Sequence, residues 1–135
     1  MQLPTQRHPD SVREMNEEAI RDYVEQHVAL LNEGVRTEDF SKFLDTFADD
    51  AVMRFEGVPA GPYIGRAAIT KAYRENPPDD TMRLTSIKST NTGILASFDW
   101  ERGGNGFFII EMRAGKTVRL DVSFLPESES VWSET

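Results

Sequence analysis

Residues 40–69, FSKFLDTFADDAVMRFEGVPAGPYIGRAAI, combine a helical pattern, a strand, a loop and the start of another helix. The first part carries an apolar stripe at helical spacing, made of Phe40, Phe43, Leu44 and Phe47. Residues 51–56 are predicted to form a strand, and the glycines and prolines of residues 57–65 predict a loop. A further helix is predicted over residues 66–75. Two consecutive prolines follow it and are expected to end it.

A longer helix is predicted before this region. Its start is open between Ser11, where Ser-Val-Arg-Glu has the spacing of a capping box, and Asn16. Gly34 is predicted to end this helix, and Thr37 is predicted to cap the next one. In the longer helix, apolar positions and His27 recur every three or four residues and form one face; they are Ile20, Tyr23, Val24, His27, Val28 and Leu31. His27 is therefore expected to face the interior of the protein.

Four strands are predicted after the last helix, over residues 82–89, 93–102, 106–113 and 116–125. Because helices precede strands, we expect an α+β fold with a mostly antiparallel sheet. Alternation places one set of side chains toward the helices, namely Ile94, Ala96, Phe98, Trp100, Val118, Leu120, Val122 and Phe124. The same alternation places Arg119 and Asp121 on the outer face, where interface ion pairing is the expected role.

The composition predicts one soluble domain. A chain of 135 residues and 15.3 kDa is long enough to bury roughly 65 to 70% of its unfolded surface around one core. We assign the domain to residues 1–135, with residues 1–10 and 126–135 as polar tails. No apolar run approaches the roughly 20 residues of a membrane span, and the first ten residues lack the apolar core of a secretory signal. A cytoplasmic location is expected.

Charge and residue usage argue against several classes of function. The net charge of −8, with no cluster of Lys and Arg, is unfavourable for binding nucleic acid. The absence of cysteine excludes a thiol nucleophile and a thiolate metal site. The two histidines, His8 and His27, belong to no spacing typical of a metal site, and no phosphate-binding glycine loop is present. We expect no metal and no cofactor.

Two segments carry a resemblance to a known family. Phe47-Ala48-Asp49-Asp50-Ala51-Val52 and the segment from Gly65 to Ile69, within a likeness that runs from about Ile20 to Phe124, resemble the nuclear transport factor 2-like superfamily. This superfamily includes ketosteroid isomerases and SnoaL-like polyketide cyclases. The resemblance implies a cone in which three N-terminal helices pack on a curved sheet and enclose an apolar cavity. It also implies a homodimer through the outer face of the sheet.

The resemblance also implies where catalytic groups would lie. The position of the donor tyrosine of ketosteroid isomerase is occupied here by His27, and the position of its base by Phe55. The position of its buried acid falls near Phe108, whereas Tyr73 matches a tyrosine that hydrogen-bonds toward the donor. Both catalytic carboxylates are therefore missing, and steroid isomerisation by that mechanism is not expected.

His27 and Tyr73 are the predicted catalytic residues. A desolvated imidazole stays neutral near pH 7 and can act as a base or a hydrogen-bond donor. The alternative for His27 is a core histidine satisfied by Tyr73 or a backbone carbonyl, and for Tyr73 a core residue with its hydroxyl at the rim. Glu56 is a third candidate, because a one-residue shift in the strand would turn it inward together with Arg54 and place Phe55 outside.

The remaining predicted site residues form an apolar wall. They are Phe55, Tyr63, Phe98, Trp100, Phe108, Ile110, Met112, Leu120, Val122 and Phe124. The alternative for this set is plain core. A cone lined by large apolar side chains with few polar groups is the usual form of a small-molecule site.

Two functions follow as hypotheses. The first is a SnoaL-like protein that binds a small hydrophobic molecule, such as a polyketide, a steroid or an aromatic carbonyl compound. If it is an enzyme, it is expected to be a cofactor-independent isomerase, cyclase or lyase that uses proton transfer by His27 and Tyr73. The second is a scaffold or protein-interaction module that uses the sheet face or the cavity mouth, with Val131 and Trp132 as candidate contacts. A void of ~300 Å³ or more that reaches His27 would favour the first.

Overall fold

The computed structural model describes residues 12–125, which begin with a short 3₁₀ helix, η2 (Val12–Glu14). The α-helices are α1 (Glu17–Thr37), α2 (Ser41–Leu44) and α3 (Arg66–Glu75). The strands are β1 (Phe47–Glu56), β2 (Tyr63–Ile64), β3 (Met82–Ser89), β4 (Ile94–Trp100), β5 (Asn105–Arg113) and β6 (Lys116–Leu125). The candidate contacts Val131 and Trp132 lie outside the described residues.

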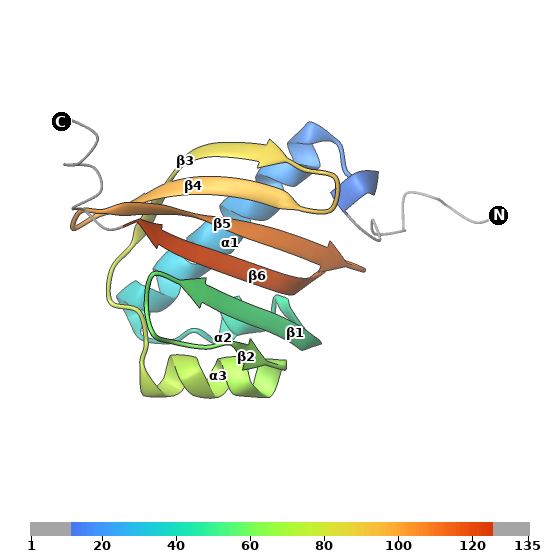
Figure 1. The fold of residues 1–135 in the computed structure, drawn as a ribbon. Helices are drawn as coiled ribbons and strands as arrows, with labels where there is room; N and C mark the ends of the chain where they lie inside the picture. Colours follow the sequence, from blue (N-terminus) through green and yellow to red (C-terminus); the bar gives the residue numbers. More distant parts are fainter. Residues whose placement is uncertain (1–11, 126–135) are drawn as a thin grey trace.

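The strands form one six-stranded sheet in the order β2-β1-β6-β5-β4-β3. Only the β1–β6 pair is parallel among the described strands, so the sheet is mostly antiparallel, and the α+β prediction is confirmed. Figure 1 shows α1 crossing one face of the sheet, with α3 beside the β1–β2 edge. The opposite face carries no helix in residues 12–125. None of the helices in this range is both long and apolar enough to span a bilayer.

Helix α1 begins directly after Asn16, the second of the two expected starts. The side chain of Asn16 accepts a hydrogen bond from the Ala19 N–H at 2.8 Å, which satisfies one free amide of the first turn. The helix continues past Gly34 to Thr37, so the predicted end at Gly34 and the capping role of Thr37 are wrong. Gly34 instead makes room for Phe40, because a Cβ at this glycine would lie 2.3 Å from the Phe40 ring.

Helix α2 is much shorter than predicted, and β1 begins earlier. The apolar stripe predicted a helix up to Phe47, whereas α2 ends at Leu44 and Phe47 is the first residue of β1. The cause is a distant strand: Phe47 pairs with Thr117 of β6, and the Thr117 N–H donates to the Thr46 carbonyl at 2.9 Å. Pairing between distant segments overrides the local helical pattern here.

A bulge in β6 corrects the predicted face of Val118. Met112 of β5 pairs with Thr117, and Glu111 pairs with Arg119, so Val118 is an extra residue without a partner. Thr117 is therefore fully buried, and its hydroxyl is 2.6 Å from the Tyr23 hydroxyl of α1. Beyond the bulge Leu120 and Val122 face the helices as predicted.

The other strands follow the predicted pattern closely. The bounds of β3, β6 and α3 agree with the prediction, whereas β4 is shorter than residues 93–102 because its end turns at Gly103 and Gly104. Within the predicted loop of residues 57–65, β2 forms two additional pairs with β1. The start of β3 is fixed to α1 by Asn32, whose side chain exchanges two hydrogen bonds of 2.8 Å with the backbone of Met82.

Candidate functional site

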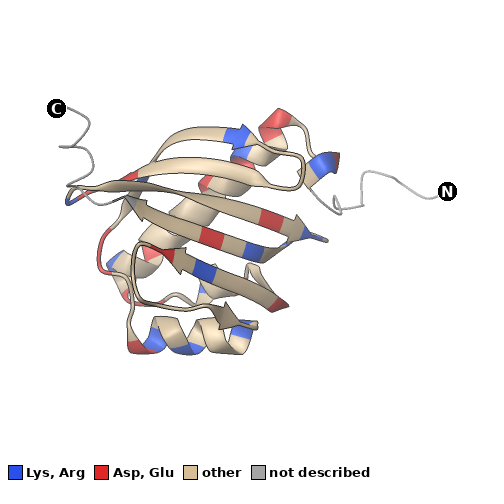
Figure 2. Cartoon of the chain, viewed as in Figure 1, with Lys and Arg blue, Asp and Glu red and all other residues tan. Residues whose placement is uncertain are grey.

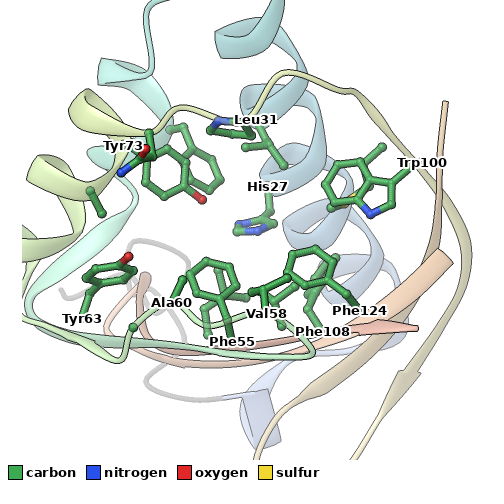
Figure 3. Close-up of a pocket in the computed structure, with 18 of the residues that line it drawn as sticks. His27, Leu31, Phe55, Val58, Ala60, Tyr63, Tyr73, Trp100, Phe108 and Phe124 are labelled. Carbon is green, nitrogen blue, oxygen red and sulfur yellow. The ribbon is translucent and has the colours of Figure 1, made fainter. Parts of the chain in front are cut away.

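A cavity of about 570 Å³ lies between the helices and the inner face of the sheet (Figure 3). Helices α1 and α3 supply His27 and Tyr73, β1 and β4 to β6 supply an apolar wall, and the loop after β1 forms part of its rim. The lining residues are His27, Leu31, Phe43, Phe55, Val58, Pro59, Ala60, Gly61, Tyr63, Ala72, Tyr73, Asn76, Pro78, Met82, Trp100, Phe108, Leu120, Val122 and Phe124. Exposed residues at the rim, such as Val58 and Asn76, open the cavity to solvent.

His27 lies in this cavity and is only 5% exposed. Its ring centroid is 5.0 Å from that of Phe43 and 5.2 Å from that of Phe108. Its Nδ1 atom is fully buried and has no hydrogen-bond partner in the part of the chain that the structure describes. Because these surroundings are apolar, burial lowers the pKa of His27 to about 4, and the imidazole is neutral at pH 7.

Tyr73 reaches the cavity from α3. Its ring packs edge-on against Phe40, at a centroid distance of 5.4 Å, and 5.5 Å from Phe43. Burial raises the pKa of Tyr73, and the nearby Tyr63 raises it further, so the hydroxyl stays protonated. Figure 3 shows this hydroxyl pointing into the cavity, toward the side where His27 lies. No hydrogen bond joins Tyr73 to His27, so neither residue satisfies the other.

One wall is a strip of three rings. The rings of Phe55 and Phe124 are 5.9 Å apart between centroids and inclined by only 5°, and Trp100 follows Phe124 at 6.0 Å and 25°. Phe55 also contacts Tyr63 edge-on at 6.2 Å. The three rings come from β1, β6 and β4, and together they form an apolar wall of nearly parallel rings.

The structure separates the predicted wall residues into two groups. Phe55, Tyr63, Trp100, Phe108, Leu120, Val122 and Phe124 line the cavity as predicted. Phe98, Ile110 and Met112 do not line it and are buried in the core. Phe98 packs against Trp100 at 5.1 Å and Phe108 at 6.0 Å. Ile110 and Met112 lie on β5, which also contacts η2.

The predicted third catalytic candidate, Glu56, is also outside the cavity. Phe55 lines the cavity, whereas Arg54 and Glu56 are exposed on β1. The strand therefore places Phe55 inside and Glu56 outside, and the alternative in which Glu56 turns inward is wrong. No Asp, Glu, Lys or Arg within residues 12–125 lines the cavity. The same range contains no group of side chains that could hold a metal ion.

The charged residues of the sheet lie on its other face. Figure 2 shows charged positions along β1, β5 and β6. Arg119 bonds Asp121 at 2.7 Å and Glu111 at 3.2 Å, which agrees with the predicted outward direction of this pair. The pKa of Arg119 is raised by these carboxylates, Asp121 first. This cluster is separated from the cavity by the sheet.

Several lining residues were not predicted. Leu31 and Phe43 belong to stripes that the sequence identified, but the helical period shows only that a residue is internal, not whether it borders a void. Ala72 lies on α3 three residues after Ile69, so its position on the inner side could have been inferred. Asn76, Pro78 and Met82 follow α3, and no local pattern signals their place at the rim.

No family model matches the sequence, and no curated protein matches it. Solved structures do match. A candidate aromatic ring hydroxylase from Novosphingobium aromaticivorans has a TM-score of 0.63 and 20% identity, covering 83% of this chain and 93% of that one. A protein from Catenulispora acidiphila in complex with S-DNPA has a TM-score of 0.60 and 20% identity, covering 86% and 99%.

A third similar structure carries the name of the fold. It is a nuclear transport factor 2-like protein of unknown function from Burkholderia xenovorans, with a TM-score of 0.59 and 17% identity, covering 84% of this chain and 94% of that one. At these identities the likeness concerns the fold, and it agrees with the observed sheet order and with the cavity between helices and sheet. The chain has the nuclear transport factor 2-like fold.

Proposed function

We propose that the protein binds a small, hydrophobic molecule of the polyketide, steroid or aromatic-carbonyl type in its cavity. The observation that carries this proposal is the cavity of about 570 Å³ that reaches the buried, unpartnered imidazole of His27. Small-molecule sites typically have volumes of roughly 300 to 1,000 Å³, with apolar walls and few polar groups. The site has this form.

The alternative, a scaffold without a ligand, would leave no reason for the void. Trp100, Phe55 and Phe108 line the cavity and do not fill it. Because the cavity is open at its rim, its apolar walls stay in contact with solvent in the free protein, which gives up roughly 25 cal/mol of hydrophobic stabilisation per Å². A bound apolar molecule covers this surface, which gives the open cavity a use. The ligand-bound neighbour from Catenulispora acidiphila also supports binding as the use of this fold.

If the protein converts its ligand, the polar groups of the cavity favour proton transfer as the reaction. A neutral His27 can accept a proton from an acidified C–H or O–H of the bound molecule, and Tyr73 can donate a hydrogen bond to the oxygen on which negative charge develops. Because the pKa of His27 is about 4, it is a weak base and requires a substrate whose proton is acidic. Isomerisation, cyclisation or dehydration without a cofactor fits these groups.

A thermal-shift screen of steroids, polyketides and aromatic carbonyl compounds tests the proposal. A ligand at 100 times its dissociation constant adds about 2.7 kcal/mol to the free energy of unfolding, which corresponds to a rise in Tm of roughly 10 °C for a chain of this size. A compound that binds in the cavity is also expected to change the fluorescence of Trp100, measured in a Trp132→Phe variant that leaves this tryptophan alone. If no compound of the three classes raises Tm, the proposal is wrong.

Two further predictions from the sequence stay predictions. A homodimer through the outer face of the sheet is consistent with the half-buried Leu95, Phe107 and Ile109 on that face. The cytoplasmic location rests on the sequence alone.

A further inference from the structure

His27 and Tyr73 are among the polar side chains of the cavity that form no hydrogen bond within residues 12–125, as are Tyr63 and Asn76. Nδ1 of His27 is buried without a hydrogen bond, and the Tyr73 hydroxyl forms none within residues 12–125. A buried polar group without a partner is unfavourable, so a bound molecule that supplies the missing partner gains affinity from it. Figure 3 shows the Tyr73 hydroxyl directed toward the part of the cavity that contains His27. One polar group of a ligand placed between them can therefore serve both.

The chemistry of the two side chains selects the kind of group. His27 lines the cavity, and a neutral imidazole has one N–H and one free electron pair. The ring nitrogen that faces the ligand is therefore a donor in one tautomer and an acceptor in the other. The Tyr73 hydroxyl is protonated and donates to an oxygen. A ligand carbonyl can only accept, and it fits one tautomer of His27. A ligand hydroxyl donates as well as accepts, so it fits both tautomers and still accepts a hydrogen bond from Tyr73.

The lining disfavours charge on the ligand. The described residues that line the cavity include no Asp, Glu, Lys or Arg, so a carboxylate or an ammonium group would be buried without a counter-ion. His27 adds no positive charge at pH 7. The net charge of the chain, −8, disfavours anions further. The ligand is therefore expected to enter uncharged.

The wall selects the shape. Phe55, Phe124 and Trp100 form the strip of nearly parallel rings described above, and a planar aromatic ring can pack against such rings in an offset-stacked or edge-to-face arrangement. On these grounds, and resting on the proposed function, we infer that the ligand is an uncharged, planar aromatic molecule whose hydroxyl group is held between His27 and Tyr73.

Five compounds with one ring system test the inference at pH 7. They are naphthalene, 2-naphthol, 2-acetonaphthone, 2-naphthoate and 2-naphthylmethylammonium, and their affinities are measured by the fluorescence of Trp100 in the Trp132→Phe variant. The compounds differ only in the group that would meet His27 and Tyr73. We expect 2-naphthol to bind most tightly, with about a tenfold advantage over naphthalene, since each tenfold gain corresponds to about 1.4 kcal/mol. The ketone is expected between these two, and the two ions are expected to bind more weakly than naphthalene.

Variants of His27 and Tyr73 locate the effect. His27→Leu and Tyr73→Phe keep the apolar volume and are expected to reduce the affinity for 2-naphthol toward that for naphthalene, with naphthalene itself little changed. His27→Gln retains a donor and an acceptor and is expected to restore part of the preference, which a purely structural role of His27 would not produce.

The possible outcomes separate the two proposals. If naphthalene binds but 2-naphthol has no advantage, or if 2-naphthoate binds as tightly as 2-naphthol, the inference is wrong and the proposed function stands. If the preference for 2-naphthol persists in both His27→Leu and Tyr73→Phe, the assignment of the two anchors is wrong. If none of the five compounds binds, the proposed function fails for aromatic ligands, and the inference fails with it.

Discussion

The protein is expected to lose about 3 kcal/mol of stability between neutral pH and pH 4 relative to a His27→Gln variant, because His27 must remain neutral in the folded state. The unfolded chain takes up a proton at this histidine near its ordinary pKa of 6.5, whereas the folded protein takes it up only near 4. Between these values the unfolded state binds more protons, so stability falls as pH falls. The contribution is fully present above about pH 6.5 and is lost through the folded pKa, with about 2 kcal/mol already lost at pH 5.

Chemical denaturation at several pH values between 7 and 4 measures this difference. The carboxyl groups that titrate in the same range are common to both proteins and cancel in the comparison. His8→Gln is the matched control, since it removes the other histidine of the chain. His27→Leu is a second variant that also cannot titrate, which guards against an effect specific to glutamine. Equal pH dependence of the wild type and both His27 variants would show that the imidazole is not buried as described.

Replacement of Ala72 by phenylalanine is expected to weaken ligand binding by about 100-fold or more, which corresponds to about 2.7 kcal/mol. Ala72 lines the cavity from α3, on the same helix as Tyr73. A phenyl group at this position occupies the space that a planar ligand needs, and it fills apolar volume. The stability of the free protein is therefore expected to change little, because the better packing offsets a helix-propensity loss of about 0.5 kcal/mol.

The matched control is Ala67→Phe on the same helix. Ala67 is exposed and does not line the cavity, so this variant has the same change in composition and helix propensity. We expect it to bind with the affinity of the wild type in the fluorescence titration. Loss of binding in both variants would indicate a general effect on α3, and retained binding in Ala72→Phe would place the ligand outside the cavity.

The sequence predicts the elements whose signals are local. Helix α3 has the predicted bounds because Gly65 precedes it and prolines follow it, and β3 and β6 alternate clearly. The start of β1 at Phe47 was missed because it depends on pairing with Thr117, seventy positions away in the chain. The bulge at Val118 was missed for the same reason, since only the register with β5 reveals the extra residue.

The candidate site was predicted as far as periodicity allows. His27 was identified because it lies on the apolar face of a helix, and Tyr73 because the resemblance implies a hydrogen-bonding tyrosine at its position; both line the cavity. Alternation placed Phe98 and Leu120 on the inner face equally well, but it carries no information on how far along the strands the cavity extends, and only Leu120 lines it. That boundary is a property of the tertiary packing.

Histidine-selective NMR of a His8→Gln variant tests the central claim most directly, because the only imidazole signals then come from His27. The signals are expected to stay constant from pH 8 to 5, since the pKa is about 4, and to shift when 2-naphthol is added at neutral pH. Titration of the imidazole near its ordinary pKa of 6.5, or signals unchanged by a compound that raises Tm, would contradict the account.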